Sequence, residues 1–221
     1  MVRVYQLYDQ GTASDPEDRM IFNPPFYFGV ADGVSGLYTP KTGPTLFLGR
    51  TGGQMVCDML VDSFASHQTQ RGSPEEVLDY PLRTIEEILE YANRRVRETQ
   101  RKKGVVLKNT ELLAGATLAI AKIDQQKVEL IQLGDAFALW VLKSGKIGIT
   151  KNQVFGHDME MREVISSLMQ KHGGDRGKMW EEFGPILAQY RRERVNNPDN
   201  PIGYGLFNGQ EEVAQCWRKI T

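Results

Sequence analysis

Residues 27–36 read YFGVADGVSG, a short and largely apolar run that reaches an aspartate inside a glycine turn. Such a run is typical of a buried strand. A carboxylate at the end of a buried strand costs desolvation free energy unless a partner offsets it. We therefore expect Asp32 to be paired with a cation, with a basic side chain, or with backbone N–H groups that cap the turn.

The segments on either side of this strand predict strands and helices in turn. Residues 2–8 (VRVYQLY) alternate with period two, as in an edge or half-buried strand. Apolar residues recur at helical spacing from about 49 to 67. A second long helix is expected to begin at the capping box of Ser73 and Glu76, with an irregular first turn at Pro81.

The second half of the chain begins with strand-like segments and ends with helical ones. Residues 113–124, 127–135 and 137–150 are strand-like segments in succession, with short turns at 124–127 and 143–146, which predicts an antiparallel meander. Helices are expected at 158–171 and 178–194, and a short last helix at 211–219. Strands, two long helices, strands and then helices indicate an α+β fold.

Composition excludes several classes of protein. The chain has 221 residues, which suits one domain over residues 1–221, and 27 basic against 28 acidic residues give a net charge of −1. This balance gives no indication of nucleic acid or an acidic membrane as a partner. Cys57 and Cys216 lie far apart, and neither a secretory apolar core nor a membrane-spanning run is present. We expect a cytoplasmic protein.

Acidic residues recur where predicted strands meet loops. Glu17 and Asp18 precede a strand, Asp32 ends one, and Asp135 follows Gly134 at the end of another. Oxygen ligands of this kind suit Mg²⁺ or Mn²⁺. Each acid alone is also compatible with an ordinary turn.

A glycine-rich stretch precedes the first predicted helix. Residues 49–53 read GRTGG, and the N-terminus of a helix that begins there could hold an anion. Small residues at this place are explained equally well by close packing of the helix.

Taken in order, these motifs resemble the metal-dependent protein serine/threonine phosphatases, the type 2C or PPM family. The acidic pair of Pro16-Glu17-Asp18 is followed by FGVADGVSG at 28–36, by Gly115-Ala116-Thr117, and by GDAF at 134–137. The family patterns in the same order are an N-E-D-like segment, F-x-V-A-D-G-x-G-G, a G-S-T-A-like strand and G-D-S-R-like residues. The resemblance runs from the N-terminus to about residue 149.

The resemblance implies a four-layer α-β-β-α sandwich with two central, mostly antiparallel sheets. It also implies a centre of two Mn²⁺ or Mg²⁺ ions that hydrolyses phosphoserine and phosphothreonine in phosphoproteins through an activated water. Asp32 would bridge both metals and be the catalytic residue. The Gly33 carbonyl would bind one metal together with Glu17 or Asp18, and Asp135 would match the ligand of a weaker third metal.

The sequence departs from the family pattern in three places. It stops at WRKIT, where the family continues to a D-G and a D-N motif that complete one metal site, so a C-terminally truncated domain is expected. No arginine stands shortly before the acidic pair to bind phosphate, the nearest basic residues being Arg3 and Arg19, and GDAF replaces GDSR. The alternative is therefore a catalytically impaired regulatory or phosphoprotein-binding module, which exposed sheet edges would allow to self-associate.

Overall fold

The computed structural model describes residues 16–37, 45–69, 83–124 and 127–221, with the side chains of 67–69 excepted. The strand predicted at 2–8 and the helix start predicted at Ser73, with its irregularity at Pro81, lie outside the described residues. These predictions stay untested.

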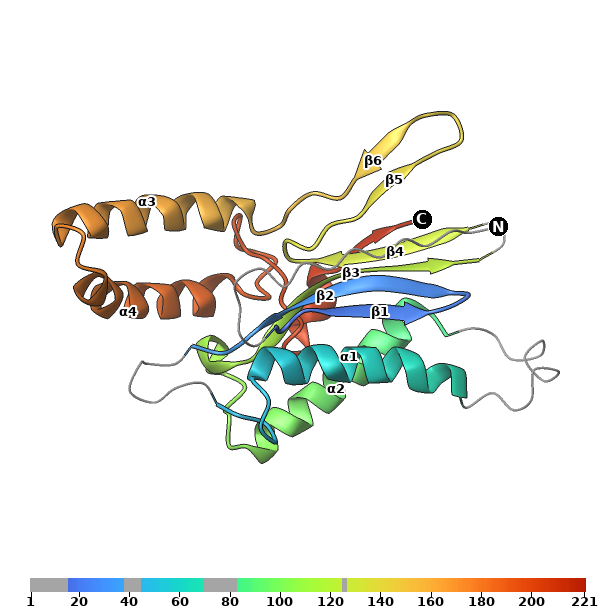
Figure 1. Cartoon of the computed structure of the whole chain (residues 1–221), viewed down its shortest axis with the longest axis horizontal. Helices are drawn as coiled ribbons and strands as arrows, with labels where there is room; N and C mark the ends of the chain where they lie inside the picture. The colour runs from blue at the N-terminus through green and yellow to red at the C-terminus, as the bar shows by residue number, and fades with distance from the viewer. Residues whose placement is uncertain (1–15, 38–44, 70–82, 125–126) are drawn as a thin grey trace.

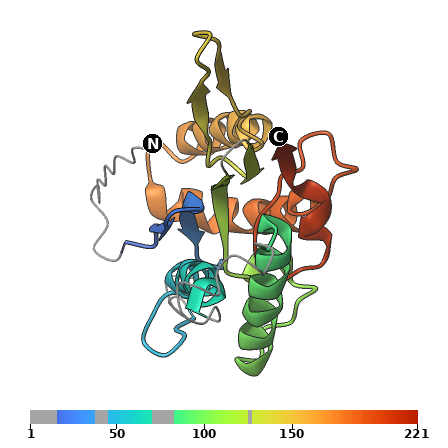
Figure 2. The ribbon, with the colours of Figure 1, turned by 90° about the vertical axis from the view of Figure 1, so that its right-hand side faces the viewer.

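The centre of the fold is a five-stranded antiparallel sheet in the order β1-β2-β3-β4-β7. Its strands are β1 (Arg19–Asn23), β2 (Tyr27–Val34), β3 (Gly115–Ile123), β4 (Val128–Leu133) and β7 (Arg218–Ile220). Helices α1 (Gly52–Thr69) and α2 (Ile85–Lys102) lie side by side on one face of the sheet (Figures 1 and 2). The prediction of an α+β fold with a largely antiparallel sheet is confirmed.

The main core lies between the sheet and these two helices. Each helix directs an apolar stripe at the sheet, and the fully buried members of the stripes are Val56, Leu60, Phe64, Ile85, Ile88, Leu89, Ala92 and Val96. Capping boxes fix both helix starts, with Thr51 and Gln54 at α1 and Thr84 and Glu87 at α2. None of the helices in the described ranges is both long enough and apolar enough to cross a membrane.

The second sheet is a two-stranded hairpin of β5 (Leu139–Val141) and β6 (Ile147–Ile149). The turn predicted at 143–146 is confirmed as the turn between β5 and β6. The prediction that one meander runs through to residue 150 is wrong, because β5 and β6 pair with each other in a separate sheet while β7 occupies the edge beside β4. Gly134, with φ of 75°, turns the chain away after β4, and a second turn at Gly145 closes the hairpin. The hairpin projects from the side of the sheet opposite α1 and α2 (Figure 2).

The short helix predicted at 211–219 is also only partly correct. A 3₁₀ helix covers Glu212–Cys216, and the chain then becomes extended at Trp217 and continues as β7. The unpaired edge of β4 explains the change, because the last residues gain ladder hydrogen bonds there that a helix would forgo.

Helices α3 (Phe155–Lys171) and α4 (Arg176–Arg194) confirm the two helices predicted for this region. They run antiparallel and enclose a small core of their own, formed by Met161, Leu168, Met179 and Phe183 (Figure 1). The C-terminal end of α4 lies beside the end of β2, and a 3₁₀ turn (Thr110–Leu112) contacts it there. This contact connects the helix pair to the sheet.

A buried polar cluster joins α3 to α4 at the same end. Arg194 is 4% exposed, donates to His157 Nδ1 at 3.1 Å, pairs with Glu160 at 2.7 Å, and lies over the Tyr190 ring. Burial, and next the charge of Arg194, lower the pKa of His157 to about 4, against an ordinary value of 6.5. The positive charge of Arg191 acts in the same direction, and the negative charge of Glu160 opposes it.

Acidification is therefore expected to weaken the folded state through His157. The unfolded chain takes up the proton near pH 6.5, whereas the folded chain resists until about pH 4, so stability is lost as pH falls through this window. Between pH 7 and pH 5 the loss from this one group is about 2 kcal/mol. Urea unfolding of the wild type and His157→Gln at both pH values measures it. Equal pH dependence in the two proteins would contradict the assignment.

Candidate metal centre

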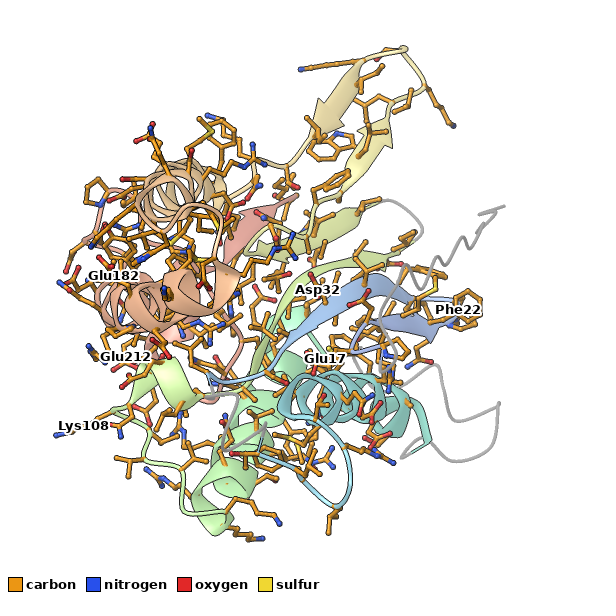
Figure 3. The ribbon with its side chains drawn as sticks, turned by 60° about the vertical axis from the view of Figure 1, so that its left-hand side comes forward. Glu17, Phe22, Asp32, Lys108, Glu182 and Glu212 are labelled. Atoms are coloured by element: carbon orange, nitrogen blue, oxygen red, sulfur yellow. The ribbon has the colours of Figure 1, made fainter. Side chains whose placement is uncertain are left out.

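The topology brings the predicted acidic residues to one end of the sheet. In an antiparallel sheet β1 and β3 begin where β2 and β4 end, as the pairing of Arg19 with Ala31 and of Leu118 with Leu133 requires. Asp18 therefore lies just before β1, Asp32 near the end of β2, and Asp135 just after β4, all at the same end. Figure 3 labels Asp32 on β2 and Glu17 near the start of α1.

Asp32 and Asp18 form a pair of carboxyl groups. Their side chains lie within hydrogen-bonding reach of each other. Desolvation, then the hydrogen bond and charge of Asp18, and then the charges of Asp135 and Glu17, raise the pKa of Asp32 from 3.8 to about 7. Both residues are open to solvent, so a small cation can reach them.

Glu17 is held differently from its neighbour. Its Oε1 accepts hydrogen bonds from the hydroxyls of Thr51 and Ser35, the latter at 2.7 Å, at the N-terminus of α1. The positive end of the helix stabilises a carboxylate there. The GRTGG stretch thus receives an anion, and that anion is the protein's own Glu17.

The glycines of this stretch also serve close packing. A side chain at Gly52 would overlap Ala114, and one at Gly53 would overlap the Glu17 carboxylate. Both explanations considered for GRTGG therefore hold at once.

Hydrogen bonds from side chains to backbone carbonyls fix the segment that carries the acids. The Arg19 guanidinium donates to the carbonyls of Pro16 and Asp18 at 3.1 and 2.8 Å, and Gln54 of α1 donates to the Pro16 carbonyl. Arg19 itself pairs with Asp58 of α1 at 2.7 Å. Arg19 is thus used to position the acidic segment.

Gly33 is required by a close approach of three segments. A Cβ at this position would lie 2.7 Å from the Cβ of Glu17 and 2.9 Å from the backbone carbon of Gly53. Any side chain here would separate β2 from the acidic segment and from α1. The segment that carries Glu17 can pack against the end of β2 only because residue 33 has no side chain.

The strands beyond β2 contribute two buried polar side chains near this end of the sheet. Thr117 of β3 is the register partner of Asp32 and is 5% exposed, and its hydroxyl has no hydrogen-bond partner among the described residues. Gln132 of β4 is fully buried, and its side-chain oxygen is likewise unpartnered within that part of the chain. Thr117 thus places a buried hydroxyl without a described partner directly opposite Asp32, whereas Gln132 lies one strand further away, opposite Ala119.

Three residues that the sequence patterns did not single out border the site. Asp135 raises the pKa of Asp158 in the first turn of α3, where burial is the larger cause. Tyr204, whose pKa is raised mainly by burial, lies within electrostatic reach of Arg191, Asp158 and Asp135. Helix α3 thus adds one more acid beside the site, helix α4 adds an arginine, and the segment after α4 adds a phenol.

The donor set suits a hard divalent cation. Mg²⁺ and its relatives are often bound by one or two carboxylates and keep several waters. Desolvation and the neighbouring carboxylates keep the pKa of Asp32 at about 7, and a divalent cation would offset the negative charge gathered there. Across the described ranges, no group of three or more His, Cys, Asp or Glu side chains is arranged to hold a metal. The residues therefore fit a cation held by the pair Asp18 and Asp32 and completed by water.

Comparisons with known proteins give structural neighbours only. No protein-family model matches the sequence, and no curated protein matches it. Solved structures that match include the serine/threonine phosphatase PstP/Ppp of Mycobacterium tuberculosis, with 15% identity and a TM-score of 0.47 over 72% of this chain and 60% of that one. The PstP catalytic domain in complex with two manganese ions matches with 16% identity, a TM-score of 0.46, and coverage of 70% and 57%.

A third match is the serine/threonine phosphatase Stp1 of Staphylococcus aureus, with 16% identity, a TM-score of 0.42, and coverage of 75% and 56%. The chain spans between 56% and 60% of the length of these three solved chains, two of which are PstP. All three structures are serine/threonine phosphatases, the class of protein that the sequence motifs resemble.

Proposed function

We propose that this chain is a phosphatase-type domain that hydrolyses phosphoserine and phosphothreonine in phosphoproteins with the help of Mn²⁺ or Mg²⁺. The observation that carries the proposal is the carboxylate pair of Asp18 and Asp32. It lies where the motif order predicts a metal centre, at the end of β2. The proposal takes residues 1–221 as one domain.

The residues have separate roles in this proposal. Asp18 and Asp32 would hold the cation, with the Gly33 carbonyl and Asp135 as further oxygen donors nearby. Glu17 would position α1 and the turn after β2 through Ser35 and Thr51. A bound divalent cation supplies a more acidic water and charge compensation for phosphoryl oxygens. Asp32, once its proton has left, is the negative group that retains the cation.

Affinity for Mn²⁺ is expected to rise with pH. The cation competes with the proton on Asp32, whose pKa is about 7. Binding should therefore be about 10-fold weaker at pH 6 than at pH 8. Calorimetric titration at the two pH values measures this. An affinity independent of pH in this range would show that the cation does not bind at the pair.

The function is tested by phosphate release. The full chain is incubated with a phosphothreonine peptide or p-nitrophenyl phosphate in Mn²⁺, and then with excess EDTA. We expect turnover in Mn²⁺ that EDTA abolishes. Turnover that persists in EDTA would overturn the proposed metal dependence.

A non-catalytic module that binds phosphoprotein is the second candidate. The absence of a group of three or more metal-binding side chains in the described part of the chain favours it. Metal binding without any turnover on either substrate would support this candidate over the enzyme.

A further inference from the structure

Arg191 differs from the other arginines around the site because no described residue is an acidic partner for it. Arg19 pairs with Asp58, Arg192 with Glu111, and Arg194 with Glu160. Across the described ranges, no carboxylate lies within ion-pairing distance of Arg191. Desolvation lowers the pKa of Arg191, although the group stays charged at neutral pH. A desolvated cation without a counter-charge is costly, so an anion is favoured beside it.

The position of Arg191 places this charge at the edge of the candidate metal centre. Its Nη1 donates to the carbonyl of Ser35, three residues after Asp32, at 3.4 Å. The hydroxyl of the same Ser35 holds Glu17. Arg191 also acts electrostatically on Tyr204, which in turn is influenced by Asp135 and Asp158. The guanidinium thus lies on the α4 side of the same turn that ends β2.

A purely structural role would leave most of its bonding capacity unused. The contacts of Arg191 are to the carbonyls of Ser35 and Glu111, both from Nη1 and both at 3.4 Å, which is the long limit for such bonds. A guanidinium has five donors in a planar fork that matches a carboxylate or a phosphate. These contacts hold the side chain at the turn, and among the described residues the other donors of the fork make no hydrogen bond.

We infer that Arg191 binds the phosphoryl oxygens of the substrate, and of inorganic phosphate, beside the cation held by Asp18 and Asp32. This inference rests on the proposed function for the identity of the anion. A phosphate group carries the charge that Arg191 lacks in a partner, and it can bind the guanidinium and the cation at once. Helix α4 would therefore contribute a substrate-binding residue from a part of the chain far from the motifs.

The test is binding of inorganic phosphate to the full chain in Mg²⁺, followed by calorimetry. Arg191→Met should weaken binding by about 10- to 100-fold, because a charged, bidentate contact is lost. Arg191→Lys should keep part of the affinity. Arg192→Met, which removes an equal charge from the next position on α4, where the residue is exposed, should change it less than about 2-fold. Thermal unfolding of each variant confirms that it is folded.

The outcomes separate this inference from the proposed function. If phosphate binding depends on Arg191 but the chain shows no turnover, the inference is supported and only the proposed catalytic activity is contradicted. Equal phosphate affinities for folded Arg191→Met and Arg192→Met, or no phosphate binding by the wild type, overturn the inference. Where turnover occurs, Arg191→Met should raise KM for the phosphopeptide, and an unchanged KM would count against it.

Discussion

Replacement of Asp32 by asparagine is expected to lower the Mn²⁺-dependent rate of phosphoester hydrolysis by about 1,000-fold or more. An amide removes the negative charge that holds the cation and leaves Asp18 without its carboxyl partner. The volume and shape of the side chain are preserved, so the fold should be retained. Initial rates with p-nitrophenyl phosphate at several Mn²⁺ concentrations measure the loss.

The matched control is Asp62→Asn, which removes an acid from the exposed face of α1. Its rate should stay within about 2-fold of the wild type, since an exposed charge of this kind contributes little to stability or to the site. An Asp32→Asn protein that is as active as Asp62→Asn would exclude Asp32 from the reaction.

Replacement of Gly33 by alanine is expected to destabilise the fold by about 3 kcal/mol. The added Cβ would lie 2.7 Å from the Glu17 Cβ and 2.9 Å from the Gly53 backbone, and backbone atoms move apart only if β2, α1 and the acidic segment shift together. The same shift should weaken Mn²⁺ binding, because it separates Asp32 from Asp18. Urea unfolding measures the change in the free energy of unfolding.

Gly177→Ala is the control for this substitution. Gly177 lies in the exposed first turn of α4, and an added Cβ would make only an ordinary 3.4 Å contact with Asp175. Its stability should be unchanged or higher by up to about 1 kcal/mol. Equal effects of the two substitutions would show that Gly33 is not closely packed.

Much of the central fold could be predicted from periodicity. The run at 27–32 became β2, the stripe of α1 and that of α2 became the core, and the helices of the second half were placed within a few residues. These elements are predictable because each buries one face in the core, so its apolar residues recur with the period of a helix or of a strand.

The turn predicted at 143–146 connects β5 and β6, but neither the separation of this hairpin from the central sheet nor the strand β7 could be predicted from the same patterns. An apolar strand pattern gives no information about which strand it pairs with, and Gly134 alone redirects the chain after β4. The last residues have a helical pattern in isolation, yet the open edge of β4 makes them a strand. Which strands pair is decided by tertiary packing, and the local spacing of apolar residues carries no information about it.

The acids of the site could be predicted from the order of the motifs, but their division of roles could not. Glu17 and Asp18 are adjacent in sequence, and only the packing at the start of α1 shows that Glu17 is bound by hydroxyls while Asp18 approaches Asp32. Asp158 and Arg191 belong to helices whose sequence is mostly solvated and charged. Only the folded structure connects these two residues with the site, because the rest of the site is formed by other segments.

The most direct test of the metal centre is a Mn²⁺ titration of the wild type, Asp18→Asn and Glu17→Gln at pH 8. We propose that Asp18 and Asp32 hold the cation and that Glu17 only positions α1. Asp18→Asn should then weaken Mn²⁺ binding by about 10-fold or more, whereas Glu17→Gln should keep it within about 3-fold of the wild type. Equal affinities for Asp18→Asn and the wild type, or no Mn²⁺ binding by the wild type, would contradict the account.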